Sequence, residues 1–373
     1  MKEKIAVITW LGKGNYGTTL QAYALKQFIE KMGYEVVFPF TFNVTILYKI
    51  KKIIMRLITF LKTGKTTDKQ KRRETGVKYD KLREHLQTYN TLYITNKKEY
   101  RSLLNTIDVY ITGSDQIWNT YHSYDPFYFL NFAKDKKRIA YASSIGTNNV
   151  PIKYQKKIRN HLMKFQYIGV REESAVKVLS ELTKRKDIIQ VPDPTFLLTK
   201  DDWNDLTQKA KIEISVPEKY MLCYLIGNNE EYSEQLKNTM KQWDIDQVVV
   251  IPAEEHPEFP LPANALVYGD AGPAEFVHLI QHATLVCTDS FHATALSINL
   301  GIDFVEFIRF HNNDNKSQNS RINDLLKHYH LSNREYSEES DSWTRPIFYE
   351  QIINTLEKDR EKALRYLIKA IKD

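Results

Sequence analysis

The feature that most constrains this chain is an alternation of short apolar runs with helical patterns, separated by polar turns. This order predicts a parallel sheet covered by helices on both faces, because parallel strands need long crossover connections. In the first half of the chain the strand-like runs lie at 5–9, 34–38, 109–112, 138–142 and 167–170. The sequence Val-Pro-Asp-Pro at 191–194 follows them, and its two prolines indicate a hinge.

Beyond the hinge the alternation starts again. A helical pattern covers 273–282, and the strand-like runs lie at 220–226, 247–251, 286–287 and 303–308. We therefore expect an α/β protein with two doubly wound Rossmann-like domains facing a cleft, the layout of the GT-B glycosyltransferases. The predicted N-terminal domain covers residues 1–194 and the C-terminal domain covers 195–373. Whether the last helix returns to the N-terminal domain stays open.

The composition fits a folded protein of this size. With 373 residues, 42% hydrophobic and 12% aromatic, the chain can bury the cores of two domains. Cys223 and Cys287 lie far apart in apolar runs and predict buried thiols in a reducing compartment. The histidines show no metal-ligand spacing, so no metal site is predicted. The N-terminal apolar run is too short for a signal peptide, and no stretch approaches the roughly 20 apolar residues of a membrane span, which predicts a cytoplasmic protein.

The net charge of +7 is concentrated in one segment. Residues 49–83 hold 13 Lys or Arg against three acids, a local charge of +10, so the remainder carries about −3. The apolar residues of 46–61 fall on one helical face, whereas Lys49, Lys52 and Arg56 fall away from it. The sequence thus predicts a basic amphipathic insertion at 44–83.

Three interpretations of this insertion stay open. A basic amphipathic helix followed by a basic run is typical of a peripheral contact with an anionic membrane, here through 46–83 at the inner membrane face. A helix docked on its own domain with a solvated basic side would show the same pattern. A basic tract can also bind the phosphates of a nucleic acid. No nucleic-acid-binding motif accompanies this one, so no nucleic-acid partner is expected.

A glycine-rich turn follows the first strand-like run. Glycines at 12, 14 and 17 match G-x-G-x-x-G before a helix expected at 18–32. No acidic ribose partner is clearly placed afterwards, since Glu35 precedes its strand, so the match gives weak support for a dinucleotide cofactor. The stronger inference is a backbone loop that approaches a ligand closely.

Polar loops also end the later strands of the first domain. They supply hydroxyl, amide and carboxylate groups together with the indole ring of Trp118. These groups suit a sugar, whose hydroxyls need donors and acceptors and whose ring face stacks on an indole. A set of capped turns would present the same residues, and Asp115 taken alone is more often a cap than a base.

In the second domain, the sequence Leu-Val-Cys-Thr-Asp-Ser-Phe-His-Ala at 285–293 joins a strand to a helix that ends at Gly301. Asp289 or Ser290 is expected as the N-cap, which places His292 in the first helical turn. Ligands bind at this edge of open α/β sheets, where orphan backbone N–H groups attract anions. A histidine there can exchange a proton with an anionic substrate, although an ordinary hydrogen-bonded histidine is the more frequent case.

Five motifs in this order resemble the polysaccharide pyruvyl transferase family. Each alone is unspecific, but together they run through a resemblance from about residue 12 to about residue 330. The motifs are NYGTTLQAYAL at 15–25, GSDQIWN at 113–119, VREES at 170–174, DPT at 193–195 and TDSFHA at 288–293.

The resemblance implies a GT-B-like enzyme that transfers the enolpyruvyl carbons of phosphoenolpyruvate onto two hydroxyls of a sugar. Phosphate is released and a pyruvate ketal remains. The resemblance implies no metal and no cofactor besides phosphoenolpyruvate as co-substrate. The acceptor it implies is a saccharide of a capsular or exopolysaccharide precursor, with lipid linkage left open.

By the same resemblance, His292 and Arg171 are the candidate catalytic residues, expected on opposite walls of the cleft. His292 matches the family's histidine and would shuttle protons, while Arg171 would clamp the anionic donor. Many members read Arg-Leu-His where this chain reads Ser-Phe-His, so a family arginine is missing, and Arg309 or the Ser320–Arg321 pair is expected to replace it. The candidate donor-binding residues are Arg171, Ser290, Arg309, Ser320 and Arg321.

The acceptor would then lie on the N-terminal domain and the donor on the C-terminal domain. The candidate acceptor-binding residues are Asn15, Tyr16, Gly17, Gln21, Ser114, Asp115, Gln116, Trp118, Asn119 and Ser144. Two other functions stay open. A nucleotide-sugar-dependent GT-B glycosyltransferase would share the cleft, and a non-catalytic partner of a polysaccharide assembly machine would keep the fold without the chemistry.

Overall fold

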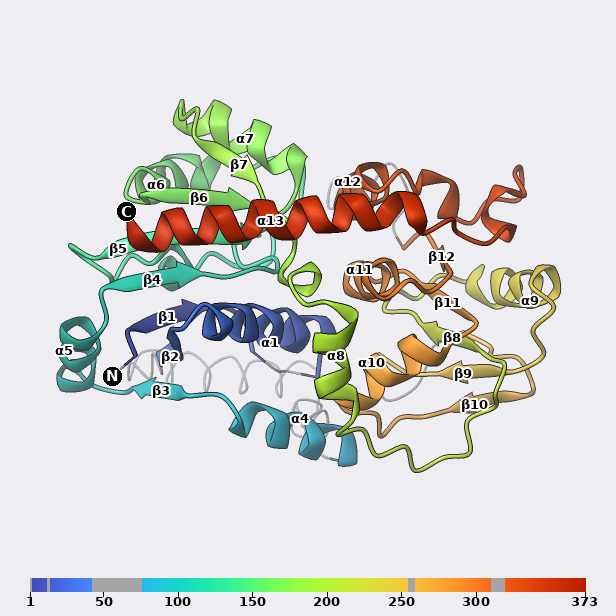
Figure 1. Cartoon of the computed structure of the whole chain (residues 1–373). Coiled ribbons are helices and arrows are strands. Elements are labelled where there is room, and N and C mark those ends of the chain that lie inside the picture. The colour runs from blue at the N-terminus through green and yellow to red at the C-terminus, as the bar shows by residue number, and fades with distance from the viewer. Residues whose placement is uncertain (1, 12–13, 42–75, 254–258, 310–318) are drawn as a thin grey trace, which may run out of the picture.

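The computed structural model describes residues 2–11, 14–41, 76–253, 259–309 and 319–373 (Figure 1). Within them the chain forms two parallel sheets, each with helices packed against it. The apolar helical face predicted at 46–61 and most of the basic insertion lie outside the described residues. The membrane-contact hypothesis for 46–83 therefore stays a prediction.

The N-terminal sheet has the strand order β3-β2-β1-β4-β5-β6-β7, and its neighbouring strands are parallel. Ile5 of the central strand β1 lies opposite Val36 on one side and Val109 on the other, so the order reverses at β1. Such a reversal is a topological switch point, where ligands bind. The strands are β1 (Lys4–Ile8), β2 (Glu35–Thr41), β3 (Thr91–Ile94), β4 (Val109–Thr112), β5 (Lys137–Ser143), β6 (Tyr167–Val170) and β7 (Ile188–Gln190).

The C-terminal sheet has the order β10-β9-β8-β11-β12 and is also parallel. At its switch point Cys223 of β8 lies opposite Cys287 of β11, and both thiols are free and buried. The predicted α/β architecture of two doubly wound sheets is confirmed. The strands are β8 (Met221–Tyr224), β9 (Val248–Val250), β10 (Ala265–Val267), β11 (Leu285–Thr288) and β12 (Phe304–Glu306).

Helices connect the strands and cover them. The residues of the central strands β4, β8 and β11 are all buried, as expected for parallel strands with helices on both faces. The α-helices are α1 (Tyr16–Lys31), α4 (Val77–Gln87), α5 (Lys97–Thr106), α6 (Ile152–Leu162), α7 (Glu173–Thr183), α8 (Lys200–Thr207), α9 (Tyr232–Gln242), α10 (Pro273–His282), α11 (Phe291–Leu300), α12 (Asn319–His328) and α13 (Glu350–Lys372). Short 3₁₀ turns lie at Pro126–Phe129, Pro194–Phe196, Ser332–Arg334 and Ser342–Thr344.

One hydrophobic core extends through both sheets. It includes Leu20 of α1 and Val286 of β11, which come from different halves of the chain. Helix α13 runs along both halves and ends beside β5 and β6 (Figure 1). There the Tyr366 hydroxyl donates to the Ala140 carbonyl at 2.7 Å. By its contacts the last helix belongs to both domains.

The described end of the basic insertion is docked on the C-terminal domain. Lys78 is 8% exposed, and its Nζ donates to the carbonyls of Pro252 and Ala253, each at 3.3 Å. Lys81 forms an ion pair with Glu275 at 3.3 Å. Two basic residues of α4 therefore serve contacts within the protein. Among the described residues, none of the helices combines the length and the apolar character that crossing a membrane requires.

Candidate active site

The first turn of α1, after β1, meets the first turn of α11, after β11, at the boundary between the domains. Gly17 of α1 is packed directly against the imidazole of His292 in α11. A Cβ at position 17 would lie 2.1 Å from His292 Nδ1, closer than side-chain atoms pack. Glycine is required here for close approach, and the group that approaches is a candidate catalytic side chain.

His292 lies where the sequence predicts. Ser290 is the N-cap of α11, and Gly301 ends the helix with a φ of +75°. His292 is 7% exposed, and its Nε2 has no hydrogen-bond partner among the described residues. Burial lowers the pKa of His292 below its ordinary value of 6.5, and Asp193 and Asp115 offset only part of this effect. The imidazole is therefore neutral near pH 7 and able to accept a proton.

Asp193 links the two candidate catalytic residues. Its Oδ2 accepts a hydrogen bond from Arg171 Nη1 at 3.1 Å and lies 3.7 Å from His292 Nε2. Ser114 Oγ donates to Oδ2 at 2.7 Å, and the backbone N–H of Thr195 donates to Oδ1 at 3.0 Å. Burial alone would raise the pKa of Asp193, but His292, Arg171 and these donors lower it, so the carboxyl stays ionised. Arg171 and His292 come from different domains, yet they share one carboxylate.

Asp115 is a second carboxylate whose charge acts on His292. Its φ of +69° lies in the left-handed region, which is uncommon for a residue other than glycine and concentrates at functional sites. The carboxylate accepts from Thr18 Oγ1 at 2.7 Å and from the Gln116 N–H at 2.8 Å. Burial raises the pKa of Asp115, but His292, Arg171 and the hydrogen bonds from Thr18 and Gln116 together lower it below its ordinary value. Two ionised carboxylates therefore stabilise the imidazolium that forms when His292 accepts a proton.

Two buried arginines create a cationic region. The Arg171 guanidinium carbon lies 4.0 Å from the centroid of the Phe291 ring, and Nε donates to Glu172 at 2.8 Å. Arg171 Nη2 has no hydrogen-bond partner among the described residues. Burial, followed by the charge of Arg171, lowers the pKa of Arg321 to about 9. Arginines that repel one another while a guanidinium N–H is unmatched favour an anionic ligand.

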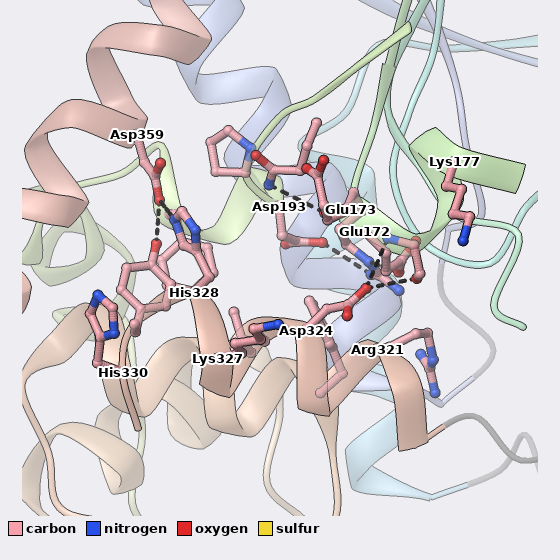
Figure 2. A pocket seen from close by; sticks show the side chains of 18 residues that line it. Glu172, Glu173, Lys177, Asp193, Arg321, Asp324, Lys327, His328, His330 and Asp359 are labelled. Carbon is pink, nitrogen blue, oxygen red and sulfur yellow. Dashed lines mark hydrogen bonds and ion pairs between the residues drawn. The ribbon is translucent and has the colours of Figure 1, made fainter. Parts of the chain in front are cut away.

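A cavity of about 640 Å³ opens beside these groups (Figure 2). It lies between α7 and α12 and continues to α13, and its volume falls within the usual range for ligand sites. The residues that line it near the candidate catalytic groups are Arg171, Asp193, Phe291 and Arg321.

Of the residues expected to replace the missing family arginine, Arg321 lines this cavity and Arg309 does not. Arg309 is bound to Asp289, with Nε 3.0 Å from Oδ2 and Nη2 3.1 Å from Oδ1. The same carboxylate accepts two backbone N–H groups of the loop after β8. Arg309 thus holds loops of the C-terminal domain together, and its assignment to the donor stays a prediction. Ser320 is half-buried beside Arg321, whereas Ser290 is buried at the start of α11.

The predicted aromatic contacts to an acceptor are part of the protein interior. Trp118 is 1% exposed, stacks on Phe129 at 5.4 Å and donates Nε1 to the Tyr128 carbonyl at 3.0 Å. The prediction that Trp118 offers a plate to a sugar is wrong, because the indole completes a core of the N-terminal domain. Tyr16 is also fully buried, stacked on Phe276 of the C-terminal domain at 4.4 Å. Its ring is an interdomain contact.

Five further predicted acceptor residues hold local structure and do not line the cavity. Asn15 caps α1, and the Gln21 amide donates to the backbone of the same helix. Asn119 Nδ2 donates to Gln116 Oε1 at 2.7 Å, and Ser144 Oγ accepts from a backbone N–H two residues away. These side chains shape the loops after β4 and β5.

The structure does bring three predicted residues, Gly17, Ser114 and Asp115, into the group around His292. Asp193 has no role of its own in the sequence prediction, where it belongs only to the hinge and to a motif. An acid between two prolines at a domain boundary is the signal that marks it in the sequence. The structure makes it the group that joins the two domains' candidate catalytic residues.

The family model for polysaccharide pyruvyl transferase matches residues 15–312. The match includes Gly17, Asp115, Arg171, Asp193 and His292 and covers most of the chain. The chain therefore belongs to the polysaccharide pyruvyl transferase family and is a transferase of polysaccharide biosynthesis with a polysaccharide acceptor. No curated protein sequence matches it.

Solved structures share the fold at low sequence identity. A protein from Listeria monocytogenes assigned as a UDP-N-acetylglucosamine 2-epimerase is 11% identical with a TM-score of 0.50, covering 98% of this chain and 95% of that one. The UDP-GlcNAc 2-epimerase from Methanocaldococcus jannaschii is 13% identical with a TM-score of 0.48, over 96% and 100%. Arabidopsis thaliana UGT89C1 complexed with UDP-L-rhamnose is 10% identical with a TM-score of 0.47, over 100% and 94%. The first likeness supports the GT-B-like fold alone.

Proposed function

We propose that this chain is a ketal pyruvyltransferase with phosphoenolpyruvate as donor and a saccharide of a capsular or exopolysaccharide precursor as acceptor. The observation that carries the proposal is that Arg171, Arg321 and Asp193 line one cavity, with a neutral His292 behind Asp193, its Nε2 3.7 Å from Asp193 Oδ2. A donor with a carboxylate and a phosphate needs cations, and ketal formation needs a group that accepts and returns protons.

In the proposed reaction His292 takes the proton of one acceptor hydroxyl, and the imidazolium passes a proton to the methylene carbon of phosphoenolpyruvate, which becomes the methyl group. The neighbouring carbon becomes electrophilic and forms a C–O bond with the oxygen of that hydroxyl. Its C–O bond to phosphate breaks, and a second hydroxyl forms the second C–O bond. Of the two hydroxyl protons lost, one is balanced by the new methyl group and the other leaves with phosphate. The products are the pyruvate ketal and inorganic phosphate.

The residues have distinct tasks in this scheme. Arg171 and Arg321 bind the carboxylate and phosphate of the donor, and bidentate guanidinium contacts fix its orientation. His292 takes the proton from an attacking hydroxyl, and as imidazolium it returns a proton to the methylene carbon. Asp193 and Asp115 stabilise the imidazolium between these two transfers.

The test incubates the purified protein with phosphoenolpyruvate and a panel of saccharides that carry neighbouring free hydroxyls. We expect phosphate release that depends on the acceptor, together with an acceptor mass increase equal to the added C₃H₂O₂ unit. His292→Ala should lose at least about 10²-fold in rate while staying folded. Acceptor-independent phosphate release would contradict the proposal. Tight binding of a nucleoside diphosphate with no phosphate release would favour the glycosyltransferase alternative instead.

A further inference from the structure

The cavity exceeds what a three-carbon donor fills, and its two ends differ in chemistry. Lys177 and Arg321 lie on one side of it, whereas His328 and Asp359 lie on the other (Figure 2). Asp193 lies between these two sides in the same view. All five residues line a single space of about 640 Å³.

At the end away from Arg321, α12 meets α13 through a buried carboxylate. Asp359 is 5% exposed, and its Oδ2 accepts from the Tyr329 hydroxyl at 2.8 Å and lies 2.7 Å from His328 Nε2. Because Nε2 faces Asp359, Nδ1 is the ring nitrogen left to bind a ligand. The His328 side chain is 39% exposed and lines the cavity.

A purely structural role would be to tether α12 to α13. Tyr329 already makes that connection from the interior, because it is 3% exposed and bonds the same oxygen of Asp359. The bond from His328 adds an imidazole of fixed orientation at the cavity surface. This second feature is what a binding site needs and a tether does not.

The chemistry of this end suits sugar hydroxyls. An imidazole nitrogen at the cavity surface and the carboxylate of Asp359 both form hydrogen bonds with hydroxyl groups.

Building on the proposed function, we propose that the His328–Asp359 end of the cavity is the acceptor subsite and binds a neutral hexopyranose ring through its hydroxyls. The arginine end then holds the donor, and the two substrates meet at Asp193, next to His292. This places the acceptor between α12 and α13, away from the N-terminal loops that the sequence suggests.

Two substitutions at one position separate binding from tethering. In His328→Gln the amide nitrogen replaces Nε2 and keeps the bond to Asp359 but removes Nδ1. In His328→Asn the amide oxygen replaces Nδ1 but loses the contact with Asp359. The acceptor subsite predicts that His328→Gln raises the KM for the saccharide about tenfold or more with the KM for phosphoenolpyruvate unchanged, and that His328→Asn stays near the parent value. The exposed His282→Ala on α10 is the control and should change neither.

An unchanged saccharide KM in His328→Gln, or an equal rise in both KM values, overturns the subsite while leaving the proposed function in place. If the parent protein transfers no pyruvyl group, the proposed function falls, and the subsite is judged by binding alone. Saturation-transfer NMR with methyl glycosides of neutral hexoses then decides: signals in the parent that disappear in His328→Gln uphold it. No signal from any glycoside in the parent, or equal signals in both proteins, overturns it.

Discussion

Gly17 and His292 belong to different domains, and the backbone of Gly17 packs directly on the imidazole of His292. A Cβ at position 17 would lie only 2.1 Å from His292 Nδ1. Gly17→Ala must therefore displace the imidazole or the start of α1. We expect pyruvyl transfer to fall by on the order of 10²-fold, as it does when a catalytic group moves by an ångström. Overpacking should also lower the free energy of unfolding by about 1–3 kcal/mol, measured by urea unfolding.

The matched control for this change is Gly269→Ala. A Cβ at that position would meet only Pro252 Cγ, at 3.9 Å, so both turnover and stability should stay near the parent values. Full turnover in Gly17→Ala would show that the close packing does not set the position of His292.

Asp193→Asn removes a negative charge that raises the pKa of His292. Burial then acts with less opposition, so the pKa of His292 should fall further below 6.5. Because His292 must be neutral to accept a proton, the acidic limb of kcat/KM against pH should move to lower pH. The plateau should drop roughly 10- to 100-fold, since Arg171 also loses a partner. A limb that stays in place or moves to higher pH would disprove this role for Asp193.

Arg321→Gln should weaken phosphoenolpyruvate binding by about 10- to 100-fold, the range for losing one or two charge-assisted hydrogen bonds. In the parent, burial and the charge of Arg171 lower the pKa of Arg321 to about 9. Donor affinity should therefore decline as pH rises through 9, and this decline should vanish in Arg321→Gln. Titration calorimetry at pH 7 and above pH 9 measures both effects. If Arg321→Gln binds phosphoenolpyruvate as tightly as the parent protein, a residue other than Arg321 replaces the missing family arginine.

Two histidines, the buried His161 and the half-buried His85, predict that the fold is sensitive to acid. Burial lowers the pKa of His85 and of His161 to about 4, from an ordinary value of 6.5. Between these values the unfolded chain binds protons that the folded chain does not, so the free energy of unfolding should fall as pH drops from 6.5 toward 4. Urea unfolding across this range measures the slope. His161→Asn should flatten it, and an identical slope would mean that His161 titrates normally.

The basic insertion gives a prediction that depends on charge alone. Replacing Lys49, Lys51, Lys52 and Arg56 with Gln should reduce binding to anionic vesicles, since each basic residue near such a surface contributes roughly 1 kcal/mol. Co-sedimentation at two salt concentrations measures the effect. The control is the same exchange at four exposed lysines, Lys153, Lys156, Lys157 and Lys164. Equal pelleting of the parent on anionic and neutral lipid would exclude an electrostatic membrane contact.

The central strands are predictable from the sequence because both of their faces are buried. β4 and β6 match the predicted runs, and β1 and β5 differ from them by one residue at each end. The edge strands β3 and β10 carry no such signal. Leu92 and Tyr93 of β3 are 39% and 56% exposed, so this strand forms through its pairing with β2 and not through an apolar pattern of its own.

The candidate site is predictable where a side chain stands at the end of a strand or the start of a helix. Arg171 and His292 meet this condition, and both are placed correctly at their sheet edges. Trp118 lies in the polar loop after β4, and tertiary packing buries its indole, which no local pattern reveals. Arg321 and His328 lie on a helix far along the chain, and only the folding of α12 against α7 and α13 brings them to the cavity.

Helix α13 gives apolar side chains to a core that both sheets share, and its final turn bonds the N-terminal sheet. Residue 194 therefore separates the strands of the two sheets along the chain, but the parts on either side of it are not independently stable. Halves expressed separately on either side of it would each expose apolar surface, and the N-terminal half would lack the helix that covers β5 and β6. We expect neither half to be soluble alone, so recombination between relatives should succeed only when the last helix travels with the N-terminal sheet it covers.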